Sequence, residues 1–161
     1  MGTVISDNQT MLLFVGPKDA FSTNSKSSGV VIDRVGEVLK IPVFKFEFDF
    51  VSPHDLESMI SSIASKGKTE SRLCLLLGGS HLEDHITLCA LYGLAEGLEV
   101  HLLKDCVISQ QPQFDSVYIA KLVQAGVVPT TLAQLLLQWT ALEPDEAKRI
   151  WLREMSSTLL A

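Results

Sequence analysis

Residues 73–80 read Leu-Cys-Leu-Leu-Leu-Gly-Gly-Ser, an apolar run that ends in a turn sequence. An uninterrupted apolar run of this length is typical of a strand that is buried on both faces of a parallel sheet. A helical pattern follows from about residue 82 to residue 96 and is terminated by Gly97. Residues 98–103 then form a second strand-like run. This stretch predicts two parallel strands joined by a crossover helix.

The same alternation of strands and helices extends through most of the chain. Further strands are predicted at residues 11–15, 42–48 and 127–128, and further helices at residues 29–39, 52–66, 114–124, 132–139 and from Pro144 onward. Phenylalanines alternate with charged residues from residue 44 to residue 50, which is typical of a strand near a sheet edge. We predict an α/β fold with a three-layer, doubly wound, mostly parallel sheet. We expect a single domain over residues 1–161, with a core at residues 11–140 and a C-terminal helix at residues 144–155.

The composition excludes several classes of partner. The chain has 13 basic and 19 acidic residues, so its net charge of −6 has the wrong sign for binding to nucleic acid. The apolar runs are far shorter than the roughly 20 residues that span a membrane. The three cysteines are widely spaced, which predicts neither a disulfide framework nor a set of zinc ligands. We expect an intracellular protein, cytoplasmic rather than mitochondrial, with no cofactor.

Four segments together resemble a known family, the isochorismatase-like cysteine hydrolases. They are residues 12–21, 75–85, 97–105 and 125–131, and the similarity extends over roughly residues 11–140. The chain is most similar to the short branch that includes the animal isochorismatase-domain proteins. The resemblance implies a Rossmann-like fold and a hydrolase reaction that uses an Asp, a Lys and a Cys. In that chemistry a helix N-terminus and a nearby Lys stabilise the nucleophilic thiolate.

The resemblance also implies that this catalytic triad is degenerate here. His85 stands at the position of the nucleophile and Gly16 at that of the Asp, while either Lys45 or Glu47 stands at that of the Lys. Asp19 follows Gly16 closely and is a candidate replacement for the missing carboxylate. We therefore expect a pseudoenzyme, and we name His85, Asp19 and Lys45 as the candidates for any remaining catalysis. The candidate binding residues at the same turn are Gly79, Ser80, His81 and Asp84.

An alternative hypothesis keeps a hydrolase activity on a small amide, ester or enol ether. Cys89 lies one helical turn beyond His85, and Cys106 follows a strand end, where we expect it to be more exposed. His81 and His85 are four residues apart and share one helix face, which is half of a zinc-binding motif, although the sequence offers no obvious third ligand. Binding of a small molecule without chemistry at the strand ends is a further possibility.

Apolar residues in the C-terminal helices indicate self-association. Leu132, Leu135, Leu136, Leu142 and Trp151 form a ridge that is richer than a small monomer needs. Together with the phenylalanine row, this ridge predicts a homo-oligomer or a protein partner.

Overall fold

A computed structural model describes residues 6–17, 28–48, 53–80 and 82–160. The strands are β1 (Thr10–Pro17), β2 (Val43–Phe48), β3 (Cys74–Ser80), β4 (Glu99–Ile108) and β5 (Val128–Thr130). The helices are α1 (Ser28–Leu39), α2 (Pro53–Thr69), α3 (Thr87–Ala95), α4 (Asp115–Ala125), α5 (Leu132–Leu142) and α6 (Glu146–Leu160). A π-helical turn (Leu82–Ile86) precedes α3. None of the helices in the described ranges is long and apolar enough to cross a membrane.

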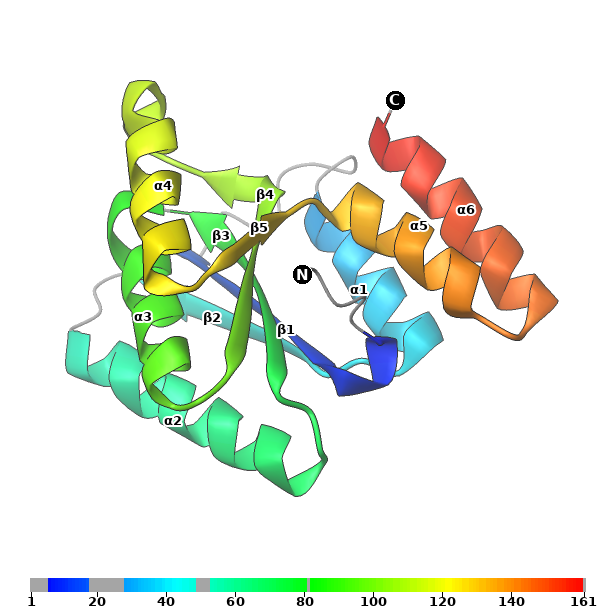
Figure 1. Cartoon of the computed structure of the whole chain (residues 1–161), viewed down its shortest axis with the longest axis horizontal. Helices are drawn as coiled ribbons and strands as arrows, with labels where there is room; N and C mark the ends of the chain where they lie inside the picture. The colour runs from blue at the N-terminus through cyan, green and yellow to red at the C-terminus, as the bar shows by residue number, and fades with distance from the viewer. Residues whose placement is uncertain (1–5, 18–27, 49–52, 81, 161) are drawn as a thin grey trace.

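The five strands form one sheet in the order β2-β1-β3-β4-β5, and every neighbouring pair is parallel. Helices α2, α3 and α4 cover one face, while α1, α5 and α6 cover the other (Figure 1). The predicted three-layer, doubly wound fold is therefore confirmed, and β2 lies at a sheet edge as its alternating pattern predicted. The strand order reverses between β1 and β3, and this reversal is where such folds place their ligands.

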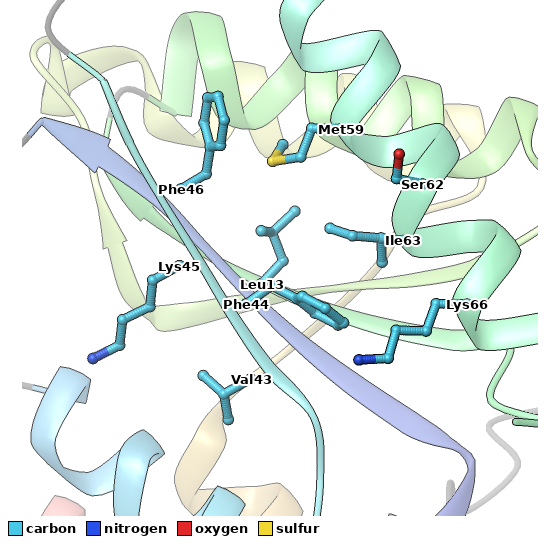
Figure 2. Close-up of a pocket in the computed structure, with 9 residues that line it drawn as sticks. All are labelled: Leu13, Val43, Phe44, Lys45, Phe46, Met59, Ser62, Ile63 and Lys66. Carbon is cyan, nitrogen blue, oxygen red and sulfur yellow. The ribbon is translucent and has the colours of Figure 1, made fainter.

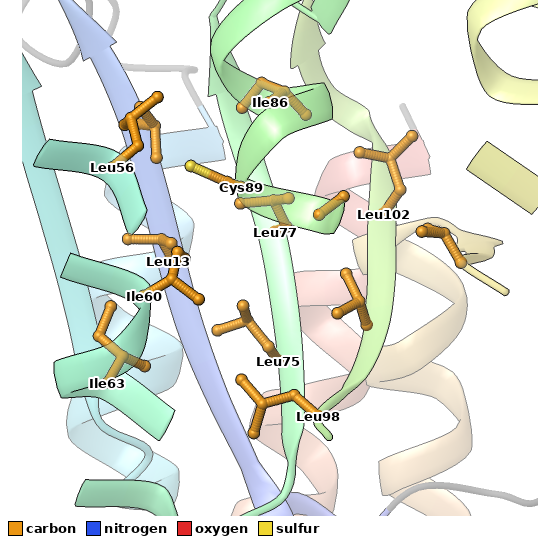
Figure 3. Packing of buried hydrophobic residues seen from close by; sticks show 14 of the residues in the cluster. Leu13, Leu56, Ile60, Ile63, Leu75, Leu77, Ile86, Cys89, Leu98 and Leu102 are labelled. Carbon is orange, nitrogen blue, oxygen red and sulfur yellow. The ribbon is translucent and has the colours of Figure 1, made fainter. Parts of the chain in front are cut away.

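The central strands explain why the apolar runs are uninterrupted. In β1 and β3, Leu13, Leu75 and Leu77 pack against α2 and α3, as Figure 3 shows. Their neighbours Leu12 and Leu76 belong to a second core cluster on the opposite face, with residues of α1 and α5. Because successive strand residues point to opposite faces, both sets must be apolar.

Strand β4 extends further than its apolar pattern predicted. It continues past Leu103 to Ile108, and its pairing with β3 shifts between Leu77 and Gly79. The exposed residues Lys104 and Asp105 lie in this irregular stretch, so they interrupt the apolar pattern without ending the strand. The predicted helix from residue 82 also differs, because its first turn is π-helical.

A side chain at Gly79 would collide with the neighbouring central strand β1. The φ angle of Gly79 is +128°, which L side chains rarely adopt. A Cβ atom at this position would lie 2.7 Å from the backbone nitrogen of Val15 and would overlap the carbonyl oxygen of the same residue. Only glycine therefore fits at this point of the β1–β3 pairing.

We expect Gly79→Ala to lower the free energy of unfolding by at least about 3 kcal/mol, because it combines backbone strain with overpacking against a central strand. Gly97→Ala is the matched control, since Gly97 also has a positive φ of 83° but has open space around it. The control should lose only about 1–2 kcal/mol. Urea unfolding measures both variants. Equal losses would contradict a close approach at Gly79.

Candidate functional site

The carboxyl ends of the strands bring several predicted site residues to one edge of the sheet. Val15 pairs with Gly79, and Gly16 pairs with Glu47 of β2. Ser80 ends β3 beside Ile108 of β4. The π-helical turn that carries Asp84 and His85 begins two residues after Ser80. Gly16, Gly79, Ser80, Asp84 and His85 therefore belong to the edge at which α/β folds bind ligands.

The π-helical turn is fixed by packing and by hydrogen bonds. Leu82 and Ile86 are fully buried and anchor it in the core. The Thr87 hydroxyl donates to the carbonyl of Leu82 at 2.6 Å, across the width of the turn. The Glu83 carboxylate accepts from the backbone N–H of Gln110 at 3.1 and 3.3 Å, which ties the turn to the segment after β4. The apolar pattern of the sequence carries no signal for this wider turn, because buried positions remain at helical spacing.

His85 is half-buried within this turn, and its Nδ1 atom is buried. Asp84 is exposed beside it. Asp19 and His81, which the sequence analysis named with them, lie outside the described residues. The described part of the predicted site thus offers one imidazole and one solvated carboxylate at the turn.

Lys45 is directed away from this turn. Its ammonium donates to Asp33 of α1 at 2.7 Å, and its register partner Phe14 packs in the core cluster on the α1 face. The turn with His85 is anchored in the cluster on the opposite face, through Leu82 and Ile86. The structure therefore does not bring Lys45 together with the turn that holds His85. Glu47, the other candidate at this position, is exposed at the end of β2.

All three cysteines are buried, with exposed fractions of 3% for Cys74, 0% for Cys89 and 5% for Cys106. Figure 3 shows Cys89 among Leu56, Leu77 and Ile86. Burial raises the pKa of Cys89 to about 12. Burial also raises the pKa of Cys74, and the negative charge of Glu99 raises it further.

The expectation that Cys106 is exposed is wrong. Strand β4 does not end beside Cys106 but continues to Ile108, which keeps the thiol within the core cluster on the α1 face. Its Sγ lies 3.5 Å from Oδ1 of Asp105. With Cys106 buried, none of the three thiols is at the surface of the sheet edge where His85 lies.

Asp105 has a structural role that the sequence analysis missed. Its carboxylate accepts from the backbone N–H of Leu132 at 2.9 and 3.1 Å and from that of Ala133 at 3.4 Å. These donors lie at the start of α5, where Thr131 also caps the helix by accepting from Gln134 N–H at 3.1 Å. The carboxylate therefore satisfies free N–H groups and complements the helix dipole. Only the local cap at Thr131 had a sequence signal, because Asp105 acts across 27 residues.

A groove of about 560 Å³ opens along the edge strand, between β2 and α2 (Figure 2). Phe44, Phe46 and Met59 supply much of its apolar wall, and Lys66 lies over the Phe44 ring at 5.2 Å from the centroid. Lys45 is directed away from Met59 and Ile63 in Figure 2. The groove lies beside the sheet and not at the carboxyl ends of the strands. Its mostly apolar lining suits binding of an apolar group.

A second group of polar residues lies at the opposite edge of the sheet, where β3 and β4 begin. Cys74, Glu99 and His101 each offer one ligand atom, and these atoms lie within 4.8 Å of one another. Neither the cysteine spacing nor the pair of histidines at the turn predicted this group, because it forms only when β3 and β4 are aligned.

No family model matches the chain, and no curated protein matches it. Similar solved structures do exist. YcaC from Pseudomonas aeruginosa, solved with hexane-2,5-diol and covalent acrylamide, has a TM-score of 0.70 and 14% identity, over 99% of this chain and 91% of its own. The MAR1 ribonuclease from Caenorhabditis elegans has a TM-score of 0.67 and 18% identity, over 95% of this chain and 92% of its own.

The YcaC protein of Escherichia coli, described as an octameric hydrolase of unknown specificity, has a TM-score of 0.54 and 15% identity. That likeness covers 99% of this chain and 98% of the other. At these identities the three likenesses establish a shared fold. Activity has to be inferred from the site itself.

We expect Asp105→Ala to lower the free energy of unfolding by about 1–2 kcal/mol, because it removes a helix cap and its charge. Asp105→Asn keeps an acceptor oxygen and should lose roughly half as much. Asp84→Ala, at an exposed position, should stay within about 0.5 kcal/mol of the wild type. Thermal or urea unfolding compares the three variants. If Asp105→Ala were as mild as Asp84→Ala, the capping role would be contradicted.

Proposed function

We propose that this chain is a member of the isochorismatase-like superfamily that has lost the Asp-Lys-Cys hydrolase reaction and acts as an oligomeric or complex-forming scaffold. The shared fold and the motif at residues 75–85 support the family. The main support for the proposed loss of hydrolase activity is that all three cysteines are buried.

The chemistry of the proposed loss follows from what the family reaction requires. A cysteine attacks as its thiolate, which needs an accessible position near positive charge or a helix N-terminus. Here an imidazole occupies the nucleophile position, and Gly16 has no carboxylate to offer. The ammonium of Lys45 is already paired with Asp33 at 2.7 Å. These departures affect all three roles of the triad.

A second candidate function is a hydrolase that uses a relocated nucleophile or a bound metal. It is favoured by the π-helical turn at Leu82–Ile86, because such turns are frequent at functional sites. The Escherichia coli YcaC protein, described as a hydrolase, supports the same class. Hydrolysis of a small amide, ester or enol ether that is abolished by His85→Ala would favour this candidate over the scaffold.

Although the MAR1 structure is described as a ribonuclease, we do not propose that this chain cleaves RNA. A net charge of −6 disfavours binding to a phosphate backbone, because affinity for nucleic acid comes from Lys and Arg at the phosphates. We therefore propose that nucleic acid is not a partner of this chain.

Self-association is supported by two observations. The Escherichia coli YcaC protein is described as octameric. In this chain Leu142 of α5 and Ile150 of α6 are 57% and 54% exposed, which leaves apolar surface on the helical pair. The other members of the predicted ridge pack within the chain, since Leu132, Leu135 and Leu136 are buried in the core and Trp151 is partly buried against it. We propose that the outer surface of α5 and α6 contributes to an interface between copies.

We expect native protein to resist alkylation by acrylamide, the compound bound covalently in the Pseudomonas aeruginosa YcaC structure. Thiolate is the reactive form, and a pKa of about 12 keeps Cys89 almost entirely protonated at neutral pH. Raising the pH increases its thiolate fraction only as the pH nears that value. Mass spectrometry follows the adducts at each cysteine across pH.

Unfolding in denaturant is the control, and it should make all three cysteines reactive at the same pH. A single cysteine that reacts in the native protein below about pH 8 would contradict the proposed loss of thiol chemistry and would identify the nucleophile.

Light scattering should give a solution mass at least twice that of the chain. The double variant Leu142→Glu/Ile150→Glu is expected to reduce that mass, because it places charge on the proposed interface. Val117→Glu is the control, since Val117 has a similar exposed fraction of 51% but lies on α4. A monomeric wild type would contradict self-association. Dissociation by the control variant alone would place the interface on α4.

A further inference from the structure

Cys74, Glu99 and His101 are aligned by the parallel pairing of β3 and β4. Cys74 begins β3 and pairs with Glu99, which begins β4, while His101 pairs with Leu76. Because side chains alternate along a strand, all three are on one face of the sheet. Cys74 and Leu76 belong to the core cluster beneath α1, α5 and α6, so this is the face concerned.

The backbone beneath this group is firmly held. The N–H of Glu99 donates to the carbonyl of Leu73 at 2.8 Å, which fixes the start of β4 against the start of β3. The Arg72 guanidinium donates to the carbonyls of Asp7 and Thr10 at 3.2 and 2.9 Å and to that of Lys40 at 3.2 Å. Ligands carried on strands held in this way are placed more accurately than ligands on loops.

Burial and charge at this edge favour a cation. Cys74 is 3% exposed and His101 5% exposed, whereas the Glu99 side chain is 51% exposed and leaves a path from solvent. The imidazole Nε2 of His101 lies 3.0 Å from Oε1 of Glu99. A carboxylate therefore lies beside a buried thiol and a buried imidazole. A divalent cation among them would be neutralised by the carboxylate and by a thiolate.

We propose that Cys74, Glu99 and His101 form a binding site for one divalent cation of the Zn²⁺ class. Thiolate, imidazole and carboxylate are the three protein donors that zinc prefers, whereas calcium and magnesium take oxygen ligands alone. Three protein ligands leave the fourth tetrahedral position to water. On binding, the Cys74 thiol releases its proton to solvent as the sulfur–metal bond forms.

The geometry requires only small adjustments of the side chains around the ion, in which His101 Nε2 and Glu99 Oε1, now 3.0 Å apart, separate slightly and the wider pairs approach. Zinc–ligand bonds of about 2.0–2.3 Å in a tetrahedron place neighbouring ligand atoms about 3.3–3.8 Å apart. The three ligand atoms here lie within 4.8 Å of one another. Rotation of the exposed Glu99 side chain and small shifts of the Cys74 and His101 side chains would bring the three ligand atoms to the spacing that zinc requires. The site is independent of the proposed loss of hydrolase chemistry, because it lies at the opposite edge of the sheet from His85.

Cobalt(II) is the probe that reports directly on the sulfur ligand. We expect titration of reduced, metal-free protein with Co²⁺ to produce a sulfur-to-metal charge-transfer band that saturates at one ion per chain. Cys74→Ser should abolish the band. Cys106→Ser should retain it, because Cys106 is a buried thiol of the same core cluster that lies outside the ligand group. No band in the wild type, or a band that survives Cys74→Ser, would overturn the site.

Glu99→Gln tests the site without disturbing the core, because Glu99 is exposed. We expect Zn²⁺ to raise the Tm of the wild type by about 5 °C or more when it saturates the site. The affinity of Glu99→Gln for Zn²⁺ should fall at least about tenfold, the loss caused even by partners outside the coordination sphere. If Glu99→Gln bound Zn²⁺ with unchanged affinity, Glu99 would not be a ligand and the proposed three-residue site would be wrong. If Zn²⁺ did not shift the Tm of the wild type, the metal site would be overturned, and the three residues would form only a hydrogen-bonded packing arrangement.

Discussion

Leu12 and Leu13 of β1 lie beside Leu76 and Leu77 of β3, and all four are fully buried, one from each strand toward each face of the sheet. Two apolar faces have to be covered, so the helices must lie on both sides of the strands. Crossover connections through these helices make the strands parallel and gather their carboxyl ends at one edge and their amino ends at the other. Both candidate sites follow from this arrangement.

The two edges have different chemical groups. At the carboxyl edge the described residues include Gly16 near the end of β1, small residues at the end of β3, and the carboxylate of Asp84 and the imidazole of His85 in the π-helical turn. At the amino edge a thiol, an imidazole and a carboxylate converge. A nucleophilic cysteine has to be accessible to its substrate, whereas Cys74 at the second edge is buried. The same residue type is thus suited to metal ligation and unsuited to attack on a substrate.

Local patterns predicted the fold because a buried strand requires a continuous apolar run and a helix requires apolar residues at helical spacing, and both patterns are visible in the sequence. The edge position of β2 and the glycine that follows α3 have local signals of the same kind, and Gly97 does adopt a positive φ angle. The burial of Cys106 was missed because Lys104 and Asp105 mimic a strand end. The cap by Asp105 and the cluster around Cys74 were missed because each joins residues that are more than twenty positions apart. Such contacts have no local signal.

The π-helical turn persists for reasons that do not involve catalysis. Leu82 and Ile86 anchor it in the core, Thr87 closes it by a hydrogen bond and Glu83 ties it to the segment after β4. Each of these contacts is made by a residue of the turn or its flank other than His85. A widened turn at the end of β3 is therefore weaker support for hydrolysis than the buried cysteines are for its loss. The burial of a thiol acts directly on the reacting atom, because it suppresses the thiolate itself.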